Sequence, residues 1–254
     1  MSLEQLFGLT GKRALITGGA TGIGRAIAAA FVCAGAEVTI VGDREDDLNE
    51  TAHDLSVHSI HLRLGTRDAS EHMVADAKRI MGGTDIFISN AGIEGPISGL
   101  MDLDEDAYLA AFDVNLHAAN WASAALIPDM AAQGGGSFIF MSSLCMLRGN
   151  KAIATYSMTK AALAQLARNI AVAHGPENIR ANAIAPGLIE TPFARGLMQN
   201  AEFMARRMQA TPLRRVGQPE EIAAAALWLA GPGGAFTTGQ TITVDGGTLI
   251  HDGS

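Results

Sequence analysis

A cluster of glycines between an apolar run and a helical pattern constrains the fold of this chain most strongly. Residues 14–16 are apolar and predict a buried strand, and the pattern from residue 23 onward predicts a helix. The segment between them reads Thr17-Gly18-Gly19-Ala20-Thr21-Gly22-Ile23-Gly24. Glycine allows a sharp turn, and a helix N-terminus offers unpaired N–H groups to phosphate. A purely structural turn would also use glycines, but this position favours a turn that binds a dinucleotide pyrophosphate.

The rest of the chain alternates between short apolar runs and helical patterns. The predicted strands cover 13–17, 37–41, 59–64, 85–89, 137–142, 180–184 and 241–244. The predicted helices cover 23–34, 45–55, 70–81, 104–132, 155–174 and 219–229. Continuous apolar runs are typical of strands buried on both faces of a parallel sheet. We therefore expect one α/β domain over residues 1–254, a doubly wound, mostly parallel Rossmann sheet of about seven strands with helices on both faces.

Charge and composition exclude several functional classes. The formal net charge is −8, which argues against binding to nucleic acid or to an anionic membrane. No apolar run reaches the roughly 18 residues of a membrane span, and the first residues do not look like a signal peptide. Two cysteines make no disulfide framework, and the histidines show no metal-ligand spacing. We expect a cytoplasmic protein with no bound metal.

Four further motifs follow predicted strands or lie on a predicted helix. Asn90-Ala91-Gly92 follows the strand at 85–89, and Ser143 follows the strand at 137–142. Pro186-Gly187 follows the strand at 180–184, and Thr191 lies just beyond it. Because ligands bind at the carboxyl ends of the strands in such sheets, these motifs and the glycine turn should meet in one crevice. Tyr156 and Lys160 are four residues apart and share a helix face.

Together these motifs resemble those of the short-chain dehydrogenase/reductase (SDR) family, from about residue 11 to about residue 247. The resemblance implies a catalytic set of Asn115, Ser143, Tyr156 and Lys160. Tyr156 would be the general acid/base, with its pKa lowered by the nearby lysine ammonium, and Lys160 would also bind the nicotinamide ribose. Ser143 would hydrogen-bond the substrate oxygen, while the neighbouring Ser142 supports the site indirectly. Asn115 would hold a water near Lys160, although a structural kink in a helix is the alternative.

The same resemblance assigns a set of residues to the cofactor. The expected cofactor-binding residues are Gly18, Thr21, Gly22, Ile23, Gly24, Asp43, Arg44, Asp68, Asn90, Ala91, Gly92, Tyr156, Lys160, Pro186, Gly187, Ile189 and Thr191. Asp43 follows the second strand, where it would accept the ribose 2′-hydroxyl of NAD and repel the 2′-phosphate of NADP. The neighbouring Arg44 could instead attract that phosphate. We expect NAD as the cofactor because of Asp43, with NADP as the alternative. Asp68 would contact the adenine.

The segment 188–212 is longer than a usual connection and predicts a lid over the substrate, with an ordinary surface helix as the alternative. The expected substrate contacts are Ile93, Glu94, Cys145, Ile153, Leu188 and Phe193. We expect Cys145 to line the wall of the substrate pocket and not to act as a nucleophile, because no histidine motif accompanies it. Mostly apolar walls favour an uncharged or weakly polar substrate, with Glu94, Arg148 and Arg195 adding polar contacts at the rim.

The sequence therefore predicts an NAD-dependent oxidoreductase that interconverts a secondary alcohol and a ketone. One alternative is an NADP-dependent 3-oxoacyl-[acyl-carrier-protein] reductase. Such enzymes carry arginines to dock the carrier, where this chain has Gly134 and Glu177. A second alternative, of another class, is a non-catalytic nucleotide sensor or scaffold. The alanine-rich helix after Tyr156 predicts a homo-oligomer, and relatives suggest a tetramer.

Overall fold

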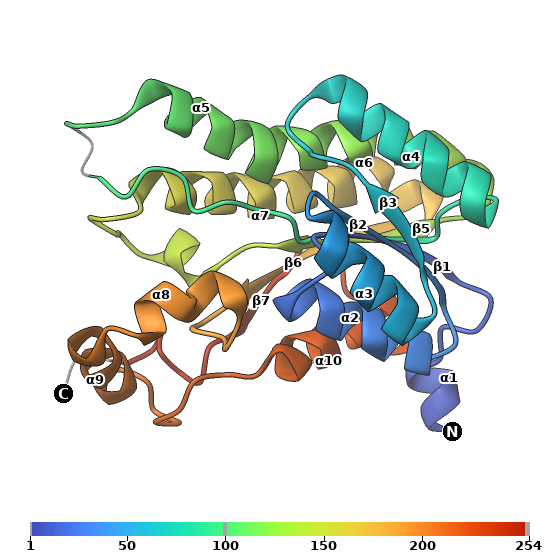
Figure 1. Cartoon of the computed structure of the whole chain (residues 1–254). Coiled ribbons are helices and arrows are strands. Elements are labelled where there is room, and N and C mark those ends of the chain that lie inside the picture. The colour runs from blue at the N-terminus through green and yellow to red at the C-terminus, as the bar shows by residue number, and fades with distance from the viewer. Residues whose placement is uncertain (1, 99–100, 252–254) are drawn as a thin grey trace.

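A seven-stranded parallel sheet forms the centre of the molecule (Figure 1). The computed structural model describes residues 2–98 and 101–251. The strand order is β3-β2-β1-β4-β5-β6-β7. Successive strands are added toward one edge up to β3 and toward the other edge from β4 onward, so the order of addition reverses between β1 and β4. The strands are β1 Arg13–Thr17, β2 Glu37–Gly42, β3 His58–His61, β4 Ile86–Ser89, β5 Gly136–Met141, β6 Ile179–Pro186 and β7 Thr241–Val244. The predicted α/β class and parallel sheet are confirmed.

Helices cover both faces of the sheet (Figure 1). Met73, Leu126 and Leu163 belong to a core on one face, under α4, α6 and α7. Ile27, Leu48 and Ile222 belong to the core on the other face, under α2, α3 and α10. The helices are α1 Leu3–Phe7, α2 Gly22–Cys33, α3 Glu45–Leu55, α4 Arg67–Met81, α5 Glu105–Phe112, α6 Ala118–Ala132, α7 Ala154–His174, α8 Arg195–Met198, α9 Ala201–Gln209 and α10 Pro219–Ala230. The shorter turns are η1 Asp113–His117, η2 Leu144–Leu147, η3 Gly175–Glu177, η4 Pro192–Ala194 and η5 Pro232–Gly234.

Two predicted elements differ from the observed ones. The helix expected at 104–132 is divided by the π-helical turn η1, which contains the buried Asn115. The strand expected at 59–64 ends at His61, because its partner β2 ends at Gly42. The Leu62 N–H still donates to the Gly42 carbonyl, after which the chain leaves the sheet. Leu62 and Leu64 are therefore available to line a cleft instead of pairing with β2.

The segment 188–212 is not an unstructured loop, because it holds η4, α8 and α9. It follows β6 and lies beside the carboxyl ends of the strands (Figure 1). In the described part of the chain, no helix combines the length and the apolar character needed to cross a membrane. Within the same residues, histidine, cysteine and carboxylate side chains do not gather into a group that would hold a metal ion.

Candidate active site

One cleft with a cavity volume of about 610 Å³ lies at the carboxyl ends of the strands, where the predicted motifs were expected to meet. The glycine turn, the Asn90 motif, the segment after β5, helix α7 and the segment after β6 all contribute to its lining. Residues from both sides of the reversal between β1 and β4 therefore meet here. This is the place where a doubly wound sheet binds its ligand.

The glycine turn needs its glycines for steric reasons. Gly18 has a φ of 62°, in the region that L side chains rarely adopt. A Cβ on Gly24 would overlap the carbonyl oxygen of Gly18, so only glycine allows helix α2 to begin this close to the turn. Gly18, Thr21, Gly22 and Ile23 line the cleft, whereas Gly24 lies behind them and shapes the turn.

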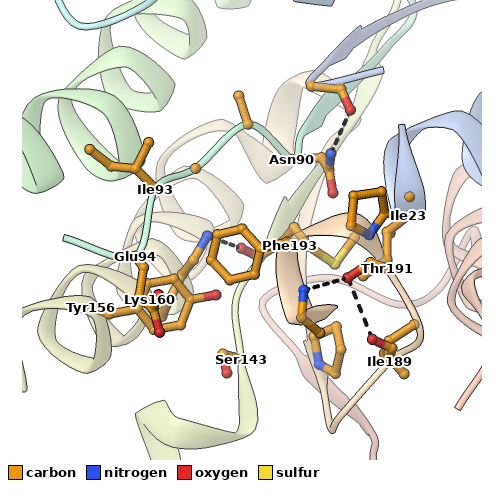
Figure 2. A pocket seen from close by; sticks show the side chains of 18 of the residues that line it. Ile23, Asn90, Ile93, Glu94, Ser143, Tyr156, Lys160, Ile189, Thr191 and Phe193 are labelled. Carbon is orange, nitrogen blue, oxygen red and sulfur yellow. Dashed lines mark hydrogen bonds between the residues drawn. The ribbon is translucent and has the colours of Figure 1, made fainter. Parts of the chain in front are cut away.

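Asn90, just after the neighbouring strand β4, and Thr17, the last residue of β1, hold the turn in place. The Asn90 side chain donates from Nδ2 to the Gly18 carbonyl over 3.0 Å (Figure 2). The Thr17 hydroxyl accepts the N–H groups of Asn90 and Ala91, at 3.0 and 3.1 Å. These bonds join the ends of β1 and β4, and Asn90, Ala91 and Gly92 line the cleft beside them.

Tyr156 and Ser143 face each other inside the cleft (Figure 2). Burial raises the pKa of Tyr156, the charges of Cys145 and Glu94 raise it further, and a hydrogen bond with the Ser143 hydroxyl lowers it. The net direction is upward, so the expected lowering of this pKa by Lys160 is not what the protein side chains produce. Ser143 also accepts the Cys145 N–H over 3.3 Å, which fixes its position at the start of η2.

Lys160 is buried, with 3% of its surface exposed. Its Nζ donates to the Met141 carbonyl over 2.8 Å and lies 5.3 Å from the centre of the Tyr156 ring. Burial lowers the pKa of Lys160 to about 8. The missing side chain of Gly92 makes room for this ammonium, because a Cβ there would lie 3.2 Å from Nζ. Ser142 supports the same helix by donating to the Lys160 carbonyl over 2.7 Å.

Asn115 lies behind the cleft and not in its lining. Its Oδ1 accepts the Ile93 N–H over 2.7 Å, and its Nδ2 donates to the Ile93 carbonyl over 2.9 Å and to Thr159 Oγ1 over 3.1 Å. Both ends of the amide are therefore used to hold the segment after β4 against α7. Oδ1 accepts one of the two hydrogen bonds that an amide oxygen can accept, so the water expected near Lys160 stays a prediction.

The end of the cleft near β2 carries mixed charge. Asp43, Arg44 and Arg63 line it, and Arg44 is paired with Asp47 at 2.7 Å. Asp68 does not line the cleft. It lies in the first turn of α4, 84% exposed, where it pairs with His72 at 3.3 Å. Sequence reasoning missed Arg63 because the strand was expected to continue through that position.

The segment after β6 closes the other side of the cleft. Pro186, Gly187, Ile189 and Thr191 line it, and the Thr191 hydroxyl caps η4 by accepting the Ala194 N–H over 3.2 Å (Figure 2). Phe193 then reaches across to Tyr156, with the two ring centres 6.1 Å apart.

The expected substrate-contact residues all line the cleft, namely Ile93, Glu94, Cys145, Ile153, Leu188 and Phe193. Arg148 lines it as well, whereas Arg195 does not. Arg207, which the sequence analysis did not single out, lines it in place of Arg195. It is four residues after Phe203, a lining residue on the same face of α9, and this helical spacing is the signal that would have found it.

Comparisons with known proteins agree with this arrangement. A family model described as enoyl-(acyl carrier protein) reductase matches residues 18–248. The human dehydrogenase/reductase SDR family member 4 is 32% identical over 245 residues, which cover 94% of this chain and 88% of that protein. An uncharacterized oxidoreductase of Mycobacterium tuberculosis is 38% identical over 248 residues, 95% of this chain and 94% of that protein.

Solved structures show the same fold. A 7α-hydroxysteroid dehydrogenase in complex with NADH and 7-oxo glycochenodeoxycholic acid superposes with a TM-score of 0.93 at 32% identity, covering 97% of this chain and 98% of that one. A short-chain type dehydrogenase/reductase from Mycobacterium ulcerans has a TM-score of 0.92 at 29% identity, over 96% of this chain and 92% of that one.

Proposed function

The chain belongs to the short-chain dehydrogenase/reductase family of NAD(P)-binding oxidoreductases, and on that premise we propose that it interconverts a secondary alcohol and a ketone with NAD. The observation that carries this proposal is the shared position of Ser143, Tyr156 and Lys160 in the cleft that the glycine turn also lines. Tyr156 acts as the general acid/base, and Ser143 holds the substrate oxygen. The segment 188–212 acts as the lid of a single domain.

The cleft fits a nicotinamide dinucleotide. The close approach of α2 to the glycine turn, which a Cβ on Gly24 would prevent, leaves N–H groups at the cleft for a pyrophosphate. Gly18, Gly22 and Ile23 would hold that end beside Asn90, and Lys160, Gly187 and Thr191 would hold the nicotinamide half. When bound, such a cofactor supplies the hydride donor or acceptor.

The protonation state of Tyr156 suits ketone reduction. A tyrosine of ordinary pKa is already protonated at neutral pH, and burial raises the pKa of Tyr156 further, so the phenol carries the proton that ketone reduction delivers to the substrate oxygen. The Ser143 hydroxyl, which shares a hydrogen bond with Tyr156, is placed to contact the same oxygen. For alcohol oxidation Tyr156 must first lose its proton, which a nearby positive charge favours. The Lys160 ammonium, 5.3 Å from the ring, contributes in that direction.

NAD is favoured over NADP by Asp43, a residue that lines the cleft just after β2. A 2′-phosphate at that place would be repelled by the carboxylate. Arg44 counts less against this proposal than the sequence suggested, since it pairs with Asp47. Arg63 is the remaining argument for NADP, because within the described residues its guanidinium has no ion pair or hydrogen bond.

The lack of arginine at positions 134 and 177 no longer argues against the carrier-protein alternative. Gly134 precedes β5 and Glu177 precedes β6, so both lie at the amino ends of their strands, away from this chain's own cleft. Their identity therefore says nothing about docking at that cleft. The description of the matching family model, enoyl-(acyl carrier protein) reductase, keeps a carrier-linked substrate in the test below.

The proposed function is tested by nicotinamide absorbance with a panel of ketones, secondary alcohols and an acyl-carrier thioester, each with NADH or NADPH and their oxidised forms. We expect turnover of free ketones, faster with NADH than with NADPH. Turnover confined to the thioester would favour the carrier-protein alternative. Cofactor binding without turnover of any substrate would favour the sensor alternative.

A further inference from the structure

Two arginines line the substrate end of the cleft without a carboxylate partner. Arg148 lies in the loop that follows η2, and Arg207 lies on α9, so they come from different segments of the cleft wall. Both belong to the lining that includes Tyr156. Over residues 2–98 and 101–251, neither guanidinium makes a hydrogen bond or an ion pair.

Among the described arginines whose guanidinium has no hydrogen bond or ion pair, Arg207 is half-buried, whereas Arg63, Arg148, Arg195 and Arg206 are exposed. The chain has 26 acidic and 18 basic residues, so carboxylates are plentiful. Arg13 pairs with Asp85, Arg25 with Asp54, Arg44 with Asp47, Arg67 with Glu71, Arg79 with Asp76 and Arg215 with Glu221. A half-buried guanidinium without a partner, with the unpaired Arg148 in the same cleft lining, therefore points to an anion that comes from outside the chain.

Arg207 is held toward the cleft by packing. Its guanidinium lies 5.4 Å from the centre of the Phe203 ring, which also lines the cleft. The side chain is half-buried, and both burial and the nearby charge of Arg148 lower the pKa of Arg207. Two like charges close together and partly withdrawn from water raise the free energy of the protein, and a bound anion relieves that cost.

Glu94 defines which end of a substrate would carry the anion. It lines the cleft beside Tyr156, where its charge raises the pKa of the tyrosine (Figure 2). Burial raises the pKa of Glu94 itself, and no arginine contributes to that shift. A negative charge next to the reacting carbon would be repelled by Glu94, whereas one at the arginine end would be attracted.

We propose that Arg148 and Arg207 bind a carboxylate of the substrate, remote from the carbon on which Tyr156 acts. The proposal rests on the proposed oxidoreductase function and adds its substrate class, an oxo acid or hydroxy acid with the acid group at the far end. It replaces the uncharged substrate that the sequence suggested, because Arg207 was not known to face the cleft. Each guanidinium offers parallel N–H donors that match the two oxygens of a carboxylate.

The test uses matched ketones with and without the charge. Three pairs are measured with NADH, namely 4-acetylbenzoate, 4-oxocyclohexanecarboxylate and 5-oxohexanoate, each against its methyl ester. We expect kcat/KM to be at least about tenfold higher for an acid than for its ester in at least one pair. In Arg207→Gln the acid should lose at least about tenfold in kcat/KM, mostly through KM, while the ester changes less than about threefold.

Arg206→Gln is the matched control, because Arg206 is the exposed neighbour in α9 and lies outside the cleft lining. It should leave the preference for the acid intact, and Arg148→Gln should reduce it. Equal rates for acids and esters in the native protein would overturn the proposal, as would an equal loss for both in Arg207→Gln.

Calorimetry separates this proposal from the proposed function. If no ketone is reduced, binding of 4-acetylbenzoate to the protein with NADH is measured for the native chain, Arg207→Gln and Arg206→Gln. Binding that Arg207→Gln weakens and Arg206→Gln does not would support the carboxylate site while the oxidoreductase assignment fails. Binding that does not depend on Arg207, or no binding at all, would overturn the carboxylate site.

Discussion

The Lys160 ammonium lies 5.3 Å from the centre of the Tyr156 ring but donates its hydrogen bond to the Met141 carbonyl, 2.8 Å away. The lysine is thus attached to the end of β5, and the tyrosine one helical turn before it in α7 reaches the cleft. Strand and helix position the two groups together. Burial is the largest influence on the titration of both groups, since it lowers the pKa of Lys160 and raises that of Tyr156.

Tyr156→Phe should reduce kcat for ketone reduction by at least about a hundredfold, because only the proton-donating hydroxyl is removed. The ring remains to pack against Phe193, so NADH affinity should change by less than about threefold. Stopped-flow or steady-state absorbance gives the rate, and quenching of tryptophan fluorescence gives the affinity. A mutant with a native rate would refute the role of Tyr156.

Lys160 should make the native protein more stable as pH rises above about 8. Its pKa in the folded state is lowered to about 8 from 10.5, so between these values the unfolded chain holds a proton that the folded chain has released. The contribution of Lys160 to the free energy of unfolding is therefore lowest below pH 8 and rises toward pH 10.5. Urea titrations across this window should show a steeper rise for the native protein than for Lys160→Met. Parallel curves for the two proteins would contradict this assignment.

Asp43→Ser should narrow the preference for NADH over NADPH by about tenfold, because a carboxylate that repels the 2′-phosphate is removed. Asp68→Ser is the matched control, since Asp68 is 84% exposed and outside the cleft lining. It should leave the ratio of kcat/KM values unchanged. Faster turnover of NADPH by the native protein would overturn the choice of NAD.

Gly24→Ala should prevent cofactor binding and cost about 1–3 kcal/mol of stability, because its Cβ would overlap the Gly18 carbonyl oxygen. Gly175→Ala is the control, because a Cβ there meets nothing within 4 Å and the residue has an ordinary helical φ of −57°. Thermal unfolding with and without NADH measures both effects. Native NADH affinity in Gly24→Ala would show that α2 can move away from the turn at little cost.

We also propose that the protein is a homotetramer, to be checked by light scattering against the chain mass of 26.4 kDa. The structure changes the argument for this. Ala164, Ala167 and Ala171 on α7 are buried in the chain's own core and are not available for a partner helix. Val172, 83% exposed on the outer face of α7, is the better candidate. Val172→Asp should lower the measured mass, and a monomeric native protein would refute the proposal.

Much of the arrangement follows from the sequence because strand ends in a parallel sheet share one edge. Gly18, Asn90, Ser143 and Pro186 each follow an apolar run, and that alone predicts that they meet. A kink at Asn115 was one of the two sequence-based interpretations, but its π-helical form was not predictable, because hydrophobic periodicity does not report which carbonyl each N–H selects.

The side chains of the segment 188–212 were predicted less well. Arg195 and Arg207 look equivalent in sequence, yet only Arg207 lines the cleft, because the docking of α9 decides which face turns inward. Asp68, expected to contact the adenine, does not line the cleft, for a related reason. It belongs to the first turn of α4 and faces solvent there, instead of continuing the line of β3 toward the cleft.

The cleft draws on the ends of β1, β4, β5 and β6, whose site residues run from Gly18 to Thr191 along the chain. During synthesis the glycine turn emerges first, but the nicotinamide end does not exist until β6 has joined the sheet beside β5. A partly folded chain can therefore hold only one end of a dinucleotide. Full affinity for the proposed dinucleotide would therefore require β1, β4, β5 and β6 to have assembled, and the cofactor would selectively stabilise chains that have folded this far.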